Sequence, residues 1–118
     1  MKIVLDVMGG DLAPQAPIDG AINALEKTNN ETKIILIGDQ KTITQHLKGF
    51  SSPRLSFYHA SESIDTSDRA SKVVKSKPDS SMVRGLNLVK EKKADAFISA
   101  GNTGAQMAVS TLLLGRIP

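Results

Sequence analysis

The segment Lys33-Ile-Ile-Leu-Ile37 is apolar at every position after its lysine, and Gly38-Asp39 closes it. A strand that is apolar on both faces is typical of a parallel sheet with helices on both sides. Residues 3–8 form a second short apolar run, which Gly9-Gly10 ends. Further strands are predicted at residues 54–59 and 95–100.

Helical periodicity appears between these strands. Ile18, Ala21, Ile22 and Leu25 are spaced like one face of a helix, which the sequence ends at residues 29–30. Four more helices are predicted: a short one after Asp39 with Ile43 and Leu47, one over residues 68–77, one capped by residues 79–81, and one over residues 103–114. The last helix is apolar on nearly every face and is expected to be buried. Alternating strands and helices predict an α/β fold with a parallel sheet.

The composition excludes several classes of function. The 118 residues are 40% hydrophobic and 23% charged, as in an ordinary globular domain. The chain has no cysteine, which excludes disulfides, thiolate metal sites and a thioester intermediate on the protein. Basic and acidic residues are interspersed, the net charge is +3, and aromatic residues make up 3%. A nucleic-acid partner is therefore not expected.

The two ends of the chain give further expectations. The N-terminus has neither the long apolar core nor the cleavage site of a secretory signal, and no run approaches a membrane span of roughly 20 residues. These features predict a soluble, cytoplasmic protein. The apolar run 112–114 lies close to the last residue with nothing after it to cover it, which predicts that the chain is the front part of a longer one.

The polar loops at the predicted strand ends are the candidates for chemistry, because open parallel sheets bind ligands outside the carboxyl ends of their strands. The strongest is Ser99-Ala-Gly-Asn-Thr-Gly-Ala105, which leaves a strand and opens a helix. Gly101 and Gly104 allow close backbone approach, while Ser99, Asn102 and Thr103 add polar side chains. Two interpretations fit equally: a site for an anion with several oxygens, or a plain turn in which Thr103 caps the helix.

The loop Asp6-Val-Met-Gly-Gly-Asp11 is the second candidate. Gly9 and Gly10 allow a ligand to approach the backbone, and the carboxylates of Asp6 and Asp11 could orient ligand groups or bind a cation. Capping of the first helix by Asp11 is the favoured alternative to a metal ligand. The loop is not GxGxxG, so the dinucleotide fingerprint is absent.

Two weaker candidates remain. Ser80 and Ser81 open a helix beside the basic residues 75 and 77, where they fit a second anion contact or an ordinary helix cap. His59 lies at a strand end beside Ser61 and Glu62, where it fits an acid or base or a structural role.

Several motifs occur here in the order in which they occur in one family. They are Asp6-Val-Met-Gly-Gly-Asp11, His59-Ala-Ser-Glu62, Asp79-Ser-Ser-Met82, Ala94-Asp-Ala96, Ser99-Ala-Gly-Asn-Thr-Gly-Ala105 and Leu114-Gly-Arg-Ile-Pro118. From first residue to last, the sequence resembles the bacterial phosphate acyltransferases of phospholipid synthesis, the PlsX family.

The resemblance implies a three-layer α/β/α architecture with a mainly parallel sheet, similar to phosphate acetyltransferases and isocitrate/isopropylmalate dehydrogenases. It implies that phosphate attacks the thioester of an acyl-acyl carrier protein, giving free carrier protein and an acyl phosphate that passes to a glycerol-3-phosphate acyltransferase. Family members are longer, so residues 1–118 are expected to be the N-terminal α/β part, without the C-terminal remainder, and inactive alone. A homodimer is also implied, and peripheral association with the inner face of the membrane is left open.

Site roles follow from the same resemblance. Ser99, Gly101, Asn102, Thr103 and Gly104 are expected around phosphate, Asp6, Gly9, Gly10 and Asp11 along the adjacent wall, and Ser80 and Ser81 beyond them. Asn102, Ser99 and His59 are the expected catalytic residues, with no cofactor and no metal. The sequence departs from the family at Leu12, where a histidine or another polar residue is expected, and at Pro78, where a basic residue is expected.

Two other functions stay open. A phosphate acetyl- or butyryltransferase that uses coenzyme A would share the fold and the phosphate loop. A non-catalytic α/β module that senses a phosphorylated ligand would share the loop without the reaction.

Overall fold

The computed structural model describes residues 1–65 and 68–117. Thr66 and Ser67 lie outside the described residues, and so does Pro118, the last residue of the closing motif Leu114-Gly-Arg-Ile-Pro118. Within the described part, no helix is both long enough and apolar enough to cross a membrane.

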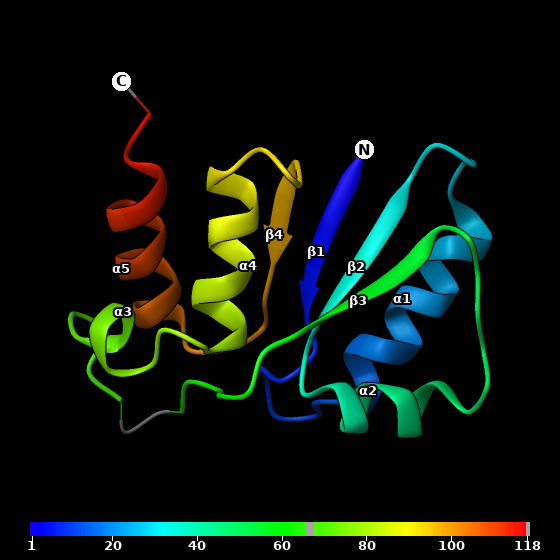
Figure 1. Ribbon diagram of the computed structural model, residues 1–118, viewed down its shortest axis with the longest axis horizontal. Coiled ribbons are helices and arrows are strands. Elements are labelled where there is room, and N and C mark those ends of the chain that lie inside the picture. The colour runs from blue at the N-terminus through cyan, green and yellow to red at the C-terminus, as the bar shows by residue number, and fades with distance from the viewer. Residues whose placement is uncertain (66–67, 118) are drawn as a thin grey trace.

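Four parallel strands form one sheet, which confirms the predicted fold class (Figure 1). The strands are β1 (Lys2–Asp6), β2 (Lys33–Gly38), β3 (Leu55–His59) and β4 (Ala96–Ile98), in the order β3-β2-β1-β4. Val4 of β1 pairs with Ile35 of β2 and with Phe97 of β4. Because all the strands run the same way, their carboxyl ends lie along one side of the sheet, which we call the carboxyl edge. The side where the strands begin is the amino edge. β1 and β4 are neighbours in the sheet, so the loops that follow them start side by side.

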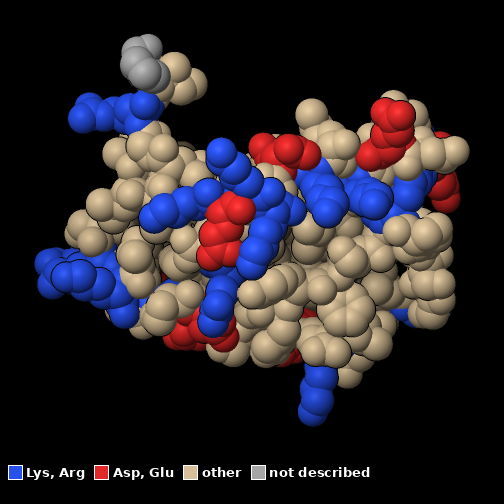
Figure 2. All heavy atoms as spheres, turned by 45° about the horizontal axis from the view of Figure 1, so that its top comes forward, with Lys and Arg blue, Asp and Glu red and all other residues tan. Residues whose placement is uncertain are grey.

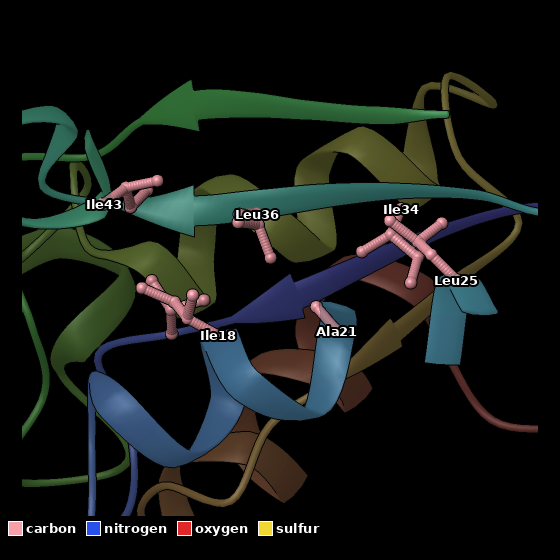
Figure 3. Close-up of a cluster of buried hydrophobic side chains, with 7 residues drawn as sticks. Ile18, Ala21, Leu25, Ile34, Leu36 and Ile43 are labelled. Atoms are coloured by element: carbon pink, nitrogen blue, oxygen red, sulfur yellow. The ribbon is translucent and has the colours of Figure 1, made fainter. Parts of the chain in front are cut away.

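Helices pack on both faces and make the three layers. On one face, α1 (Gln15–Lys27) and α2 (Gln40–Leu47) bury Ile34 and Leu36 in a cluster that Figure 3 shows. On the other face, α4 (Ser81–Lys90) covers Val4 and Ile37 through Leu88. Strand residues alternate between the two clusters, as a doubly covered strand requires.

The last helix, α5 (Thr103–Leu114), has the predicted bounds but not the predicted burial. Ala105 and Val109 are buried against α4, whereas Met107 and Leu112 are 69% and 63% exposed. Figure 1 shows the reason: α5 lies beyond α4, so one face of the helix packs and the opposite face does not.

The helix predicted over residues 68–77 is also wrong in extent, because α3 covers Val73–Ser76. The side chain of Asp68 accepts hydrogen bonds from the backbone N–H of Asp65 and from the ammonium group of Lys77. An aspartate that bonds a nearby backbone N–H in this way favours a turn over a helix. The segment before Val73 is accordingly built of turns.

The start of α1 differs from the prediction as well. The helix begins at Gln15 after Pro14, and no side chain caps it, so Asp11 is not its cap. The preceding strand ends at Asp6 instead of Met8 because the Asp6 carboxylate accepts the backbone N–H of Met8, 2.9 Å away. This local bond turns the chain out of the sheet and begins the β1–α1 loop.

Candidate functional site

The β1–α1 and β4–α5 loops meet at the carboxyl edge because their strands are neighbours. They meet backbone to backbone: a Cβ atom on Gly9 would lie 2.9 Å from both the Cα atom and the nitrogen of Gly101, and 2.9 Å from Oδ2 of Asp6. Gly10 has a φ of 98°, a conformation that side chains with a Cβ rarely adopt. Glycine is therefore required at position 9 for packing and at position 10 for the backbone conformation.

A cleft of about 660 Å³ opens where these two loops face a third segment. It is lined by residues 8–11, 63–65 and 100–104, and we call it the candidate cleft. The start of α5 lies in its wall. The geometry thus brings together the two loops that the sequence ranked first.

Asp6 lies behind the candidate cleft, and the residue is 3% exposed. Its Oδ1 accepts the N–H of Met8, and its Oδ2 accepts the hydroxyl of Ser99, 2.8 Å away. The Ser99 Oγ atom in turn accepts the N–H of Gly101 at 3.0 Å. The two residues therefore join the ends of β1 and β4.

Asn102, not Thr103, caps α5. Its Oδ1 atom accepts the N–H of Ala105 at 3.0 Å, and its Nδ2 atom donates to the carbonyl of Asp65 at 3.2 Å. Asparagine is among the best N-cap residues, and the second bond fixes the third wall of the cleft against the helix start. The turn interpretation named Thr103 as the cap, whereas the structure has Asn102 there, and the cap leaves an anion site at the same helix start open.

Thr103 and Gly104 are exposed and line the cleft at the first two positions of α5. The first N–H groups of a helix have no acceptor within the helix, and the aligned peptide dipoles place partial positive charge there. The N–H groups of Thr103 and Gly104 and the Thr103 hydroxyl are therefore suited to hydrogen-bond an anion.

Ser80 and Ser81 are both buried. Ser80 caps α4 by accepting the N–H of Val83 at 3.2 Å, which confirms the predicted cap. Ser81 lines a small cavity of about 10 Å³ with Asp6, Gly101 and other residues behind the candidate cleft, a volume close to that of one water molecule. Neither serine lines the candidate cleft itself.

His59 ends β3, the strand at the opposite side of the sheet from β4. Its Nδ1 atom accepts the N–H of Gln40 at the start of α2. Two strands separate it from the loop that contains Asn102, so the structure does not bring it together with the other predicted site residues.

Two polar groups near the site make contacts that the sequence analysis did not predict. Lys77 donates to the carbonyl of Ser63 at 2.8 Å and to the carboxylate of Asp68 at 2.7 Å, and these bonds hold the third wall of the cleft. The bond to the Asp68 carboxylate raises the pKa of the lysine. Asp79 accepts the N–H and hydroxyl of Ser61 and pairs with Arg84 at 2.6 Å. These bonds lower the pKa of Asp79 to about 2, with Ser61 the larger cause.

Positive side chains gather away from the candidate cleft. Figure 2 shows blue side chains over the amino edge of the sheet, where the strands begin. The charged residues of this surface are Lys2, Lys33, Lys92 and Lys93, with Glu31 and Asp95 among them. Among the described residues that line the cleft, none is lysine or arginine, and the described part of the chain holds no cluster of three or more residues suited to a metal ion. Within the described lining, the groups that attract an anion are therefore the N–H groups and the helix start, while the carboxylates of Asp11 and Asp65 oppose it.

Comparison with known proteins identifies the family to which the chain is related. The model of the fatty acid synthesis protein family matches residues 1–118. The chain is 48% identical over 120 residues to a phosphate acyltransferase of Chlorobaculum parvum. The aligned region covers 100% of this chain and 35% of that protein. It is 50% identical over 119 residues to one of Alkaliphilus oremlandii (99% and 35%) and 45% identical over 119 residues to one of Clostridioides difficile (99% and 34%). The chain thus spans about a third of the length of the curated relatives it matches.

Proposed function

The chain belongs to the phosphate acyltransferase (PlsX) family, and from this premise we propose that it forms the phosphate-binding part of an enzyme that transfers an acyl group to inorganic phosphate. An oxygen of hydrogen phosphate attacks the carbonyl carbon of an acyl thioester, and the carbon–sulfur bond breaks. The products are an acyl phosphate and a free thiol, which receives the proton of the phosphate. The carrier of the thioester is acyl carrier protein.

The observation that supports this proposal is the glycine-lined cleft at the start of α5. Phosphate is itself the nucleophile, so the protein contributes position and charge stabilisation instead of a nucleophile of its own. The N–H groups of Thr103 and Gly104 hold the phosphate oxygens, and the close contact of Gly9 with Gly101 brings the two loops together at the cleft. Asn102 holds the start of α5 in place, and Asp11 borders the other side of the cleft.

The remaining parts of the proposal concern the whole enzyme. We propose that residues 1–118 are the N-terminal part of a polypeptide of the relatives' length, and that groups outside this part complete the active site, including cationic groups for the phosphate. A homodimer, a cytoplasmic location with contact to the membrane surface, and delivery of the acyl phosphate to a glycerol-3-phosphate acyltransferase belong to the same proposal. The 118-residue chain alone is then inactive.

The test is phosphate-dependent release of thiol by the full-length protein that contains this chain. Acyl-acyl carrier protein and acyl-coenzyme A are supplied separately. We expect turnover with the carrier protein and little with coenzyme A. Preference for coenzyme A would identify an acetyl- or butyryltransferase, and phosphate binding without loss of either thioester would identify a non-catalytic module.

A variant of the cleft tests whether this site performs the reaction. Gly104→Leu places a side chain in the candidate cleft, and we expect it to lower turnover by about a hundredfold or more, because a displaced reactant loses its alignment. Gly20→Ala is the control, since a Cβ atom there has nothing within 4 Å. Full activity of Gly104→Leu would show that phosphate binds elsewhere.

A further inference from the structure

The hydroxyl of Ser99 has its hydrogen-bonding groups engaged within the protein. Its one hydrogen is donated to Oδ2 of Asp6, and its oxygen accepts the N–H of Gly101. A hydroxyl has one hydrogen to donate, so Ser99 cannot donate to a phosphate without losing the bond to Asp6. Ser99 and Asp6 line a separate pocket of about 520 Å³ on the α1 side of the β1–α1 loop, and neither is among the residues that line the candidate cleft.

Asp6 is engaged in the same way. Its two oxygens accept from Met8 and from Ser99, and the side chain is buried behind the loop. A buried carboxylate is costly unless its bonds are made, so both bonds constrain where the β4–α5 loop can lie. On the side of the candidate cleft, the close approach of Gly9 and Gly101 leaves beside Asp6 a cavity of only about 10 Å³, which is too small for a phosphate.

We propose that Asp6 and Ser99 are positioning residues that act through Gly101, and that neither touches phosphate. The inference rests on the proposed function of the candidate cleft and changes the role assigned to both residues. Asp6 fixes the Ser99 hydroxyl, Ser99 fixes the N–H of Gly101, and the next residue, Asn102, caps α5. The pair thus sets where the N–H groups of Thr103 and Gly104 point.

A double-mutant cycle in the full-length protein separates this role from direct contact. In Asp6→Asn, the amide oxygen can still accept the N–H of Met8, but the amide nitrogen then faces Ser99, whose hydroxyl hydrogen loses its acceptor. We expect Asp6→Asn and Ser99→Ala each to lower kcat/KM for phosphate by about tenfold to a hundredfold, and the double variant to be no worse than the poorer single variant. Ser99→Thr keeps the hydroxyl and should stay within about threefold of wild type.

The kinetic test has one control variant and two results that would contradict the proposal. Asp19→Asn removes an exposed carboxylate on α1 and should leave kcat/KM unchanged. Losses that multiply in the double variant would show that Ser99 acts on phosphate independently of Asp6. Wild-type kinetics in Asp6→Asn would equally overturn the proposal.

A second readout does not depend on turnover. Hydrogen exchange followed by mass spectrometry, on the peptide that spans residues 98–106, reports whether the loop is held. We expect protection in the wild-type protein, and faster exchange of this peptide in both Asp6→Asn and Ser99→Ala at unchanged exchange elsewhere. An unprotected wild-type peptide would contradict the positioning role even if the variants fail to fold. Slow exchange in an enzyme that transfers no acyl group would instead contradict the proposed function alone.

Discussion

At the scale of single residues, the site depends on two loops that approach more closely than side chains with a Cβ would allow. Gly9 contacts Gly101 across the ends of β1 and β4, and Asp6 and Ser99 are hydrogen-bonded just behind them. Because these glycines pack together, the two loops meet beside the start of α5, where the N–H groups of Thr103 and Gly104 face the candidate cleft. The chemistry of the site is thus set by where side chains are missing as much as by those present.

Replacing Gly9 tests this packing. Gly9→Ala places a methyl group 2.9 Å from backbone atoms of Gly101, so the loops must separate, and we expect a loss of about 1–3 kcal/mol in the free energy of unfolding. Gly104→Ala is a matched control in the same cleft, because its Cβ would make ordinary contacts at 3.5 Å or beyond. Urea denaturation measures both. Equal stability of the two variants would contradict the backbone contact.

Asp79 gives a pH dependence of stability. Its pKa is lowered to about 2 in the folded protein, against roughly 3.9 in an unfolded chain. Because the folded pKa is the lower one, the contribution is complete above about pH 4 and is lost as the pH falls toward 2. We expect Asp79→Asn to cost about 1–2 kcal/mol at pH 7 and to weaken the loss of stability between pH 4 and 2. Unfolding midpoints across pH 2–7, with Asp19→Asn as control, measure this, and identical profiles for the two variants would contradict it.

Residue roles were the hardest part to predict from sequence. The glycine-rich loop at residues 99–104 was found because its composition and its place after a strand are local features. The Asp6–Ser99 bond joins residues 93 positions apart, so it follows from strand order and not from any local pattern. The cap was assigned to Thr103 instead of Asn102 because both residue types cap helices and the choice depends on where the helix begins.

At the scale of elements, α4 approaches the sheet closely because it has a glycine where it crosses β4. A Cβ atom on Gly85 would lie 2.4 Å from the ring of Phe97. The opposite situation occurs on α1, where a Cβ atom on Gly20 would meet open space. Gly85 is therefore needed for the packing of α4 on the sheet, whereas Gly20 is not needed for the packing of α1.

This difference predicts opposite signs for one substitution. Gly20→Ala should stabilise the protein by about 0.5–1 kcal/mol, since alanine loses less conformational entropy in a helix. Gly85→Ala should destabilise it by about 1–2 kcal/mol, because the displaced Phe97 ring costs more than the helix gains. Thermal unfolding of both variants tests this, and stabilisation by Gly85→Ala would show that the contact yields easily.

Elements were predictable where a periodic pattern decided them. The strand at residues 33–38 and the last helix were found at nearly their observed bounds, since an apolar run or a cap marks each end. The helix over residues 68–77 was wrong because a turn fixed by Asp68 and Lys77 replaced its first half. The prediction that α5 is buried on all sides was wrong, because the apolar composition of a helix does not determine how many elements pack against it.

At the scale of the whole molecule, the sheet separates two kinds of surface. The carboxyl edge holds the candidate cleft with its helix start and glycines, and the amino edge holds the lysine-rich surface of Figure 2. Parallel topology produces this separation, because every loop that follows a strand falls on the same edge. The edge at which the candidate cleft lies was therefore predictable from the fold class, while its hydrogen-bond network depends on the three-dimensional structure.

We propose that phosphate binds at the start of α5, and a crystal structure of the full-length protein with inorganic phosphate would show directly whether it does. We predict tetrahedral density in the candidate cleft, with oxygens about 3 Å from the N–H nitrogens of Thr103 and Gly104, and with the Asp6–Ser99 bond intact. Phosphate bound at another edge of the sheet, with the candidate cleft holding water alone, would contradict the account.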